Sequence, residues 1–174
     1  MKNSKFSART LTIMALVCVC VVSLACVCGC AAVGQSNTQA SDAQSENRQY
    51  MTEINQKMEL LQTRLESFVD AVSRKDIVTM RTQADNAFKV IDEMTDLDVP
   101  NSLKDIHQDY LDGVNELKEA LTAYIDLYAE IDSATDEAPF DYTTYDERLS
   151  AIQEQYNSGI EKLKAGDEAA AEKE

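Results

Sequence analysis

The sequence predicts an all-α protein, an antiparallel up-and-down bundle of about four amphipathic helices that follows an N-terminal signal or anchor helix. Apolar residues recur at steps of three and four through most of 46–165, which is the period of one face of an α-helix. Pro100 and Pro139 both fall between these periodic segments, and no β-type alternation appears in the sequence. Because the period, the helix breakers and the expected helix caps agree, four helices packed side by side explain the pattern best.

The first expected helix covers 46–74 and the second covers 77–97. Apolar positions in the first advance by alternating steps of three and four residues, which is the heptad pattern of coiled coils. Methionines on such a stripe are expected to fill gaps in the core rather than to bind a metal. Asp76 precedes the second helix, where its carboxylate can accept hydrogen bonds from free backbone N–H groups. The two stripes are Met51, Ile54, Met58, Leu61, Leu65, Phe68 and Val72, then Ile77, Met80, Ala84, Ala87, Ile91 and Met94 with Phe88 beside them.

The third expected helix covers 101–132 and the fourth covers 144–164. A polar segment without apolar period, 133–143, separates them. Their apolar stripes are Leu103, Ile106, Tyr110, Val114, Leu117, Leu121, Tyr124, Tyr128 and Ile131, then Tyr145, Leu149, Ile152, Tyr156, Ile160 and Leu163.

Two residue pairs at the starts of these helices have the spacing of a capping box. Ser102 with Asp105, and Thr144 with Glu147, are each three residues apart, so that each side chain can reach the other residue's backbone N–H. Gly113 lies where the heptad of the third helix is interrupted, and we expect it to permit a close contact with another helix.

The first thirty residues hold all five cysteines and have the composition of an export signal. Lys2, Lys5 and Arg9 precede an uncharged run, and the next charged residue is Asp42. A basic segment followed by an apolar run and small residues is typical of a secretory signal peptide.

This run ends in Val27-Cys28-Gly29-Cys30, which resembles the lipobox of bacterial lipoproteins. In that family a small residue precedes a cysteine that is diacylated, and the signal is cut just before it. The resemblance implies that 1–29 is a signal peptide and that Cys30 is the lipidated residue. Cys26, which follows Leu24-Ala25, is the alternative lipidation site.

The other interpretation is an uncleaved anchor. Leu11 to Val33 comprises 23 residues, and about 20 apolar residues are enough to cross a bilayer. Two acyl chains on Cys30 would also give stable anchoring. Either way the basic N-terminus stays inside, so we expect the rest of the chain at the extracytoplasmic face of the cell membrane.

The chain after the anchor is expected to have three parts. Residues 30–45 are small and polar and are expected to form a flexible tether. The helical bundle domain follows at 46–165. Gly166 is expected to end the fourth helix, so that 166–174 forms a frayed acidic tail.

The charge of the chain excludes several classes of function. The formal net charge is −15, and three of the 16 basic residues but no acidic residue precede position 30, which gives the remainder a net charge of −18. Nucleic-acid binding requires clustered basic residues and is therefore excluded. If Cys30 is acylated, no free thiol remains for disulfides, thiol catalysis or metal ligation, and we expect no cofactor.

Five aromatic residues near the third connection are the candidate partner surface: Tyr124, Tyr128, Phe140, Tyr142 and Tyr145. Aromatic residues are enriched where proteins meet partners. The alternative is that they fill a small core between two helices.

Catalytic and metal-binding residues are sparse. His107 is the sole histidine and borders the apolar stripe, so we expect it to be half-buried or exposed. A di-iron Glu-x-x-His pair would need glutamate at position 104, where Lys104 stands. Asp92, Asp96 and Asp98 are the candidate ligands of a divalent cation, although acidic runs are usually solvated faces.

We therefore expect a membrane-anchored lipoprotein that acts as a non-enzymatic interaction or structural module, with an envelope protein as its partner. The alternative is a ligand- or cation-binding lipoprotein that serves a transporter or sensor. The first predicts a solid core and an exposed aromatic end, and the second predicts a cavity between helices or carboxylates that converge on one point. An exposed heptad face would also permit self-association.

Overall fold

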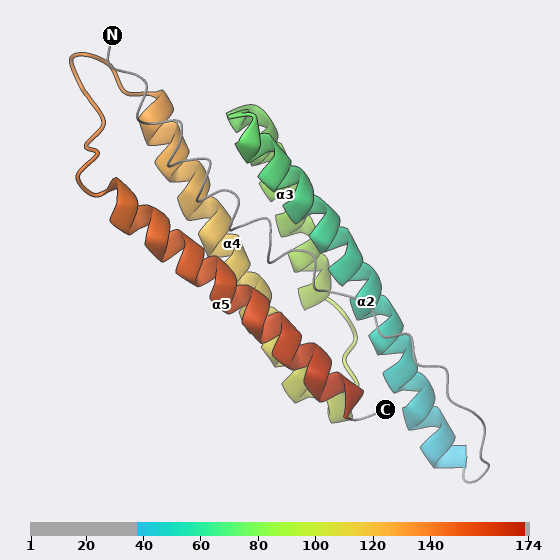
Figure 1. Cartoon of the computed structure of the whole chain (residues 1–174). Helices are drawn as coiled ribbons and strands as arrows, with labels where there is room; N and C mark the ends of the chain where they lie inside the picture. Colours follow the sequence, from blue (N-terminus) through green and yellow to red (C-terminus); the bar gives the residue numbers. More distant parts are fainter. Residues whose placement is uncertain (1–37, 173–174) are drawn as a thin grey trace.

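The computed structural model describes residues 38–172, and this part of the chain is all-helical (Figure 1). Its helices are α2 (Thr38–Ser73), α3 (Ile77–Thr95), α4 (Lys104–Asp132) and α5 (Tyr145–Ala171), with the short 3₁₀ helix η2 (Asn101–Leu103) before α4. Successive helices run in opposite directions, as the up-and-down prediction requires. The expected signal or anchor helix, with Cys30 and Cys26, lies outside the described residues.

The bundle has two ends, which we call the tip and the base. The tip carries the α2–α3 turn at 74–76 and the α4–α5 connection at 133–144. The base carries the α3–α4 connection at 96–103 and the last turns of α5. Within residues 38–172, none of the helices is both long and apolar enough to cross a membrane.

The core follows the predicted stripes closely. Neighbouring helices in the chain, α2 with α3, α3 with α4 and α4 with α5, pack against each other. Tyr50, Ala71 and Val90 are also buried, although the predicted stripes omit them. Leu127 is buried near the end of α4, whereas the neighbouring Tyr124 and Tyr128 are only half-buried. The stripe of α4 therefore rotates away from the core as the helix approaches the tip.

Glycines allow α4 and α5 to approach closely, as predicted for Gly113. A Cβ atom added at Gly113 would lie 2.9 Å from the backbone oxygen of Gly159, and one added at Gly159 would lie 2.8 Å from that of Gly113. Gly166 lies against the ring of Tyr110, with 2.9 Å between an added Cβ and the nearest ring atom. The two helix backbones therefore meet at a notch that any side chain would fill.

The predicted end of the fourth helix is wrong, because α5 continues through Gly166 to Ala171. Gly166 packs on Tyr110, and Ala170 is buried with 4% of its surface exposed. These contacts stabilise the last turn of the helix. The cost of a glycine within a helix, about 1 kcal/mol relative to alanine, is offset by this packing.

The predicted flexible tether is also partly helical, because α2 begins at Thr38 rather than near residue 46. Residues 42–49 of this extension are exposed apart from the half-buried Asn47. Its helical form therefore owes little to burial. It continues the packed part of α2, and adding a turn to an existing helix avoids the cost of nucleation.

The helix starts agree with the sequence at one position and differ at two. Asp76 caps α3 as predicted, since its Oδ1 accepts from the backbone N–H of Thr79 at 3.0 Å. The two predicted capping boxes do not form as expected, because the N-cap of α4 is Leu103 rather than Ser102 and the Thr144 side chain makes no cap hydrogen bond. The Ser102 hydroxyl instead donates to Oδ1 of Asn47 at 2.8 Å and joins the base of α2 to η2.

Candidate functional site

The tip gathers the five predicted aromatic residues around the end of α4 and the start of α5. Tyr124 and Tyr128 stack with ring centroids 6.3 Å apart, and Tyr124 meets Phe68 of α2 edge-on at 5.9 Å. Phe140, Tyr142 and Tyr145 form a second group, which we call the ring triad. The sequence prediction that these five residues lie at one end of the bundle is consistent with this geometry.

Rings of the triad lie close together at steep angles. The centroids of Phe140 and Tyr142 are 4.9 Å apart with an interplanar angle of 77°. Tyr145 lies 6.4 Å from Phe140 and 6.3 Å from Tyr142. Aromatic rings favour such edge-to-face arrangements, because the positive edge of one ring meets the negative face of another.

The aromatic tip is both a small core and an exposed surface. Tyr142 exposes 53% of its surface, whereas the other four residues are half-buried. Burial raises the pKa of Tyr124, Tyr128 and Tyr145, with smaller contributions from neighbouring tyrosines and, for the last two, from an adjacent aspartate. All three phenols are therefore neutral at physiological pH. The half-buried rings therefore form a small core between helices, as one interpretation of the sequence expected. Tyr142 provides the exposed surface that the other interpretation expected.

The segment that carries the triad is strongly acidic. Residues 126–147 contain eight acidic and no basic residues. Glu130 is neutralised from outside the segment by Arg148, whose two guanidinium nitrogens donate to its carboxylate at 2.6 and 2.8 Å. These hydrogen bonds lower the pKa of Glu130. The ion pair joins α4 to α5 directly beside the connection.

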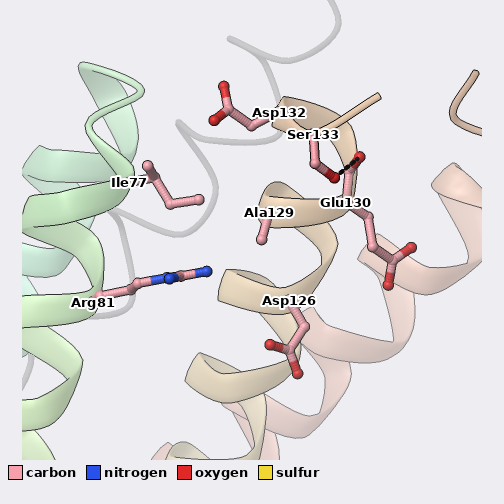
Figure 2. Close-up of a pocket in the computed structure, with 7 residues that line it drawn as sticks. All are labelled: Ile77, Arg81, Asp126, Ala129, Glu130, Asp132 and Ser133. Atoms are coloured by element: carbon pink, nitrogen blue, oxygen red, sulfur yellow. Dashed lines mark hydrogen bonds between the residues drawn. The ribbon is translucent and has the colours of Figure 1, made fainter. Parts of the chain in front are cut away.

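A groove of about 590 Å³ lies between the start of α3 and the end of α4 (Figure 2). Ile77 and Ala129 supply apolar surface, and the Arg81 side chain, below Ile77 in this view, extends from α3 toward α4. Asp126 and Asp132 also line the groove. Among the ion pairs of the described residues, none involves Arg81.

At the base, two buried tyrosines make cross-helix hydrogen bonds. The Tyr50 hydroxyl of α2 lies 2.9 Å from Nδ1 of His107 in α4. Tyr110 of α4 donates to Oδ1 of Asp167 in α5 at 2.7 Å. Burial lowers the pKa of His107 and raises that of Asp167, since both sites disfavour charge. With the imidazole neutral, Nδ1 can accept the Tyr50 proton.

The expectation that His107 is half-buried or exposed is therefore wrong, because only 8% of its surface is exposed. The prediction placed Met51 on the stripe of α2, and the half-buried Met51 does pack against the core. The neighbouring Tyr50, which the prediction omitted, is fully buried. One signal was present: Tyr50 stands four residues before Ile54, which is also a helical spacing. The only ring-nitrogen partner found for His107 in the described chain is this phenol.

The candidate cation ligands do not form a metal site in the part of the chain that the structure describes. Asp92 forms an ion pair with Lys118, with 3.2 Å between Oδ1 and Nζ. Asp96 is the C-cap of α3, directly after its last residue, Thr95. No cluster of three or more histidine, cysteine, aspartate or glutamate residues suited to a metal occurs within 38–172.

Comparison with known proteins supplies no family. No family model matches the chain, and no similar protein was found among curated sequences or solved structures.

Proposed function

We propose that this protein is an extracytoplasmic lipoprotein, anchored to the cell membrane through Cys30, whose bundle docks a partner protein at its tip. The observation that carries the proposal is the exposed aromatic cluster at that end, with Tyr142 at its most accessible point. An aromatic side chain with a polar hydroxyl loses little conformational entropy on binding and is common at interface centres. The base has no comparable exposed aromatic group among its described residues.

The rigid bundle supports this role by holding the surface away from the anchor. α4 has 29 residues, which at 1.5 Å per residue gives a length of about 43 Å. The first turns of α2 leave the base, and the aromatic tip lies at the opposite end. A partner bound at the tip would therefore be held at a distance from the membrane that the helices set.

The docking proposal is tested by photo-crosslinking in cells that express the full chain. Benzoylphenylalanine at position 142 is expected to capture a discrete protein partner. The same probe at Leu60, an exposed apolar position of α2, is the control. Equal crosslinking from both positions, or none from position 142, would reject the tip as a docking surface.

The anchoring proposal needs a separate measurement. The intact mass of the detergent-extracted protein is expected to correspond to residues 30–174 with a diacylglyceryl group on Cys30. Cys30→Ala should prevent both cleavage and acylation, whereas Cys26→Ala should change neither. A mass that retains 1–29 without lipid would refute the lipoprotein proposal.

One observation favours the alternative, a ligand-binding lipoprotein: the α3–α4 groove is lined by Arg81 together with the carboxylates of Asp126 and Asp132, and by Glu130, which is paired with Arg148. A small zwitterion could pair with both signs of charge. Free amino acids are suitable probes, and a rise in melting temperature that Arg81→Gln abolishes and Arg48→Gln preserves would support this function. An unchanged melting temperature with all twenty would reject it for this ligand class.

A further inference from the structure

We propose that the partner presents an arginine- or lysine-rich segment, and that the ring triad of the tip receives one of its cationic side chains. This inference rests on the proposed function of the tip as a docking surface. It adds the chemistry of the occupant, which follows from the charge and the ring geometry of 126–147.

The negative charge of the tip complements a basic partner. With eight acidic and no basic residues, 126–147 carries a formal charge of −8. Asp136 and Glu137 are exposed in the connection, and Asp146 and Glu147 are exposed at the start of α5. Like charges across an interface are unfavourable, so an acidic or phosphate-rich partner would be repelled and a basic one attracted.

The ring triad also presents aromatic faces near these carboxylates. Each ring carries a negative potential on its face, and a cation within about 6 Å of the centroid is attracted to it. Three rings at steep angles within 6.4 Å of one another present faces in several directions. The chain itself contains such a contact elsewhere, since Nζ of Lys118 lies 5.3 Å from the centroid of Phe88.

Acidic residues stand next to the aromatic residues along this part of the chain. Asp141 precedes Tyr142, and Asp146 follows Tyr145. Asp141 accepts from both the backbone N–H and the hydroxyl of Thr143, at 2.9 and 2.7 Å, which holds its carboxylate beside Tyr142 in the chain. A guanidinium or ammonium group on the triad would therefore have anionic neighbours as well as ring faces.

The inference is tested with the full chain in detergent and fluorescein-labelled hexaarginine as the probe. Binding is followed by fluorescence anisotropy at several salt concentrations. Any polycation is attracted to a protein of net charge −15, so the informative quantity is the difference between matched variants. Unlabelled hexaarginine should displace the probe, whereas the uncharged peptide hexaglutamine should not.

Two double variants remove the same charge from opposite ends. Asp136→Asn with Glu137→Gln alters the tip, and Asp96→Asn with Asp98→Asn alters exposed residues at the base. We expect the tip variant to raise Kd about fivefold or more and the base variant less than about twofold, because screening limits the reach of each charge to about 10 Å. Equal increases would show a general electrostatic effect and overturn the inference.

The ring contribution is tested by Tyr142→Leu, which keeps apolar surface but removes the ring. A cation–π contact at an exposed site is expected to contribute about two- to fivefold in Kd. Val78→Ala is the control, because Val78 is exposed at the same end but belongs to α3. An unchanged Kd for Tyr142→Leu, with unchanged helicity by circular dichroism, would remove the triad from the site.

The two proposals fail in different ways. If position 142 still crosslinks to a discrete protein while hexaarginine shows no preference for the tip, the partner chemistry is wrong and the docking function stands. If position 142 captures no protein, both are rejected.

Discussion

Tyrosine serves opposite purposes at the two ends of the bundle. At the base, Tyr50 and Tyr110 expose 2% and 0% of their surfaces, and each hydroxyl has a hydrogen-bond partner on another helix. At the tip, Tyr142 exposes 53% of its surface although it is packed against two other rings. Tyrosine side chains at the base therefore stabilise the fold, whereas Tyr142 at the tip remains accessible. Substitutions that separate stability from binding test this difference.

Close packing of α4 on α5 supplies the largest expected effect. Gly113→Ala places a Cβ 2.9 Å from the Gly159 oxygen and from Leu163, so the helices must move apart. We expect the free energy of unfolding to fall by about 2 kcal/mol, because overpacking outweighs the better helix propensity of alanine. Urea unfolding followed by circular dichroism measures this change. Ser150→Ala, on an exposed part of α5, is the control and should change little.

The hydrogen bonds at the base come next. Tyr110→Phe removes the donor to Asp167 and leaves that carboxylate partly buried without its phenol partner. The expected loss is about 1–2 kcal/mol, the usual cost of leaving a buried polar group unpaired. The matched variant Tyr124→Phe, at the half-buried ring of the tip, should cost less. A larger loss at Tyr124 would contradict the division of roles between the ends.

The base should also respond to pH in a defined direction. Burial lowers the pKa of His107 from 6.5, so the unfolded chain binds this proton more readily than the folded one. Stability from the neutral ring is complete above pH 6.5 and is lost as the pH falls toward the lower folded-state pKa.

Asp167 acts in the opposite sense. Burial raises its pKa from 3.8, so the folded state holds this proton more tightly and loses stability as the pH rises through the window above 3.8. The two effects oppose each other where their windows meet. Melting temperatures from pH 7.5 to 5 should therefore fall less in His107→Gln than in the wild type. An identical decline would mean that His107 does not contribute to the pH dependence.

A smaller effect of opposite sign is expected at the α2–α3 turn. Lys75 adopts φ = 59°, a left-handed conformation that favours glycine. The backbone N–H of Asp76 bonds to the oxygen of Ala71 at 3.0 Å, so the turn requires this conformation. Lys75→Gly should raise the free energy of unfolding by about 0.5–1 kcal/mol. Ser73→Gly, inside the last turn of α2, is the control and should lower it.

The sequence predicted the helices well because burial in this fold follows the apolar period. The predicted steps of four, three and four from Ile54 through Met58 and Leu61 to Leu65 all fall on buried residues. The close helix contact at Gly113 was predicted from a break in the heptad. The continuation of α5 through Gly166 could not be foreseen, because it depends on the ring of Tyr110, 56 residues earlier in the chain. Local signals describe a helix end only where no distant contact overrides them.

The two polar sites show the same limit. The aromatic tip was predictable because four of its five residues lie within 128–145 and the connection brings them together. The contact of Tyr50 with His107 joins residues 57 apart and depends on the rotation of both helices. The predicted stripe of α2 began at Met51, one residue after Tyr50, so this contact was missed.

The smallest expected effect on stability is at Tyr142, where the difference between the tip and the base can be tested most directly. Because about half of this side chain is exposed, Tyr142→Leu should change the free energy of unfolding by less than about 0.5 kcal/mol. The same substitution is expected to weaken hexaarginine binding about two- to fivefold. Tyr110→Phe should show the reverse, with lower stability and unchanged binding well below its unfolding temperature. If Tyr142→Leu instead destabilises the bundle as much as Tyr110→Phe, the tip ring is a core residue and the surface role assigned to it is wrong.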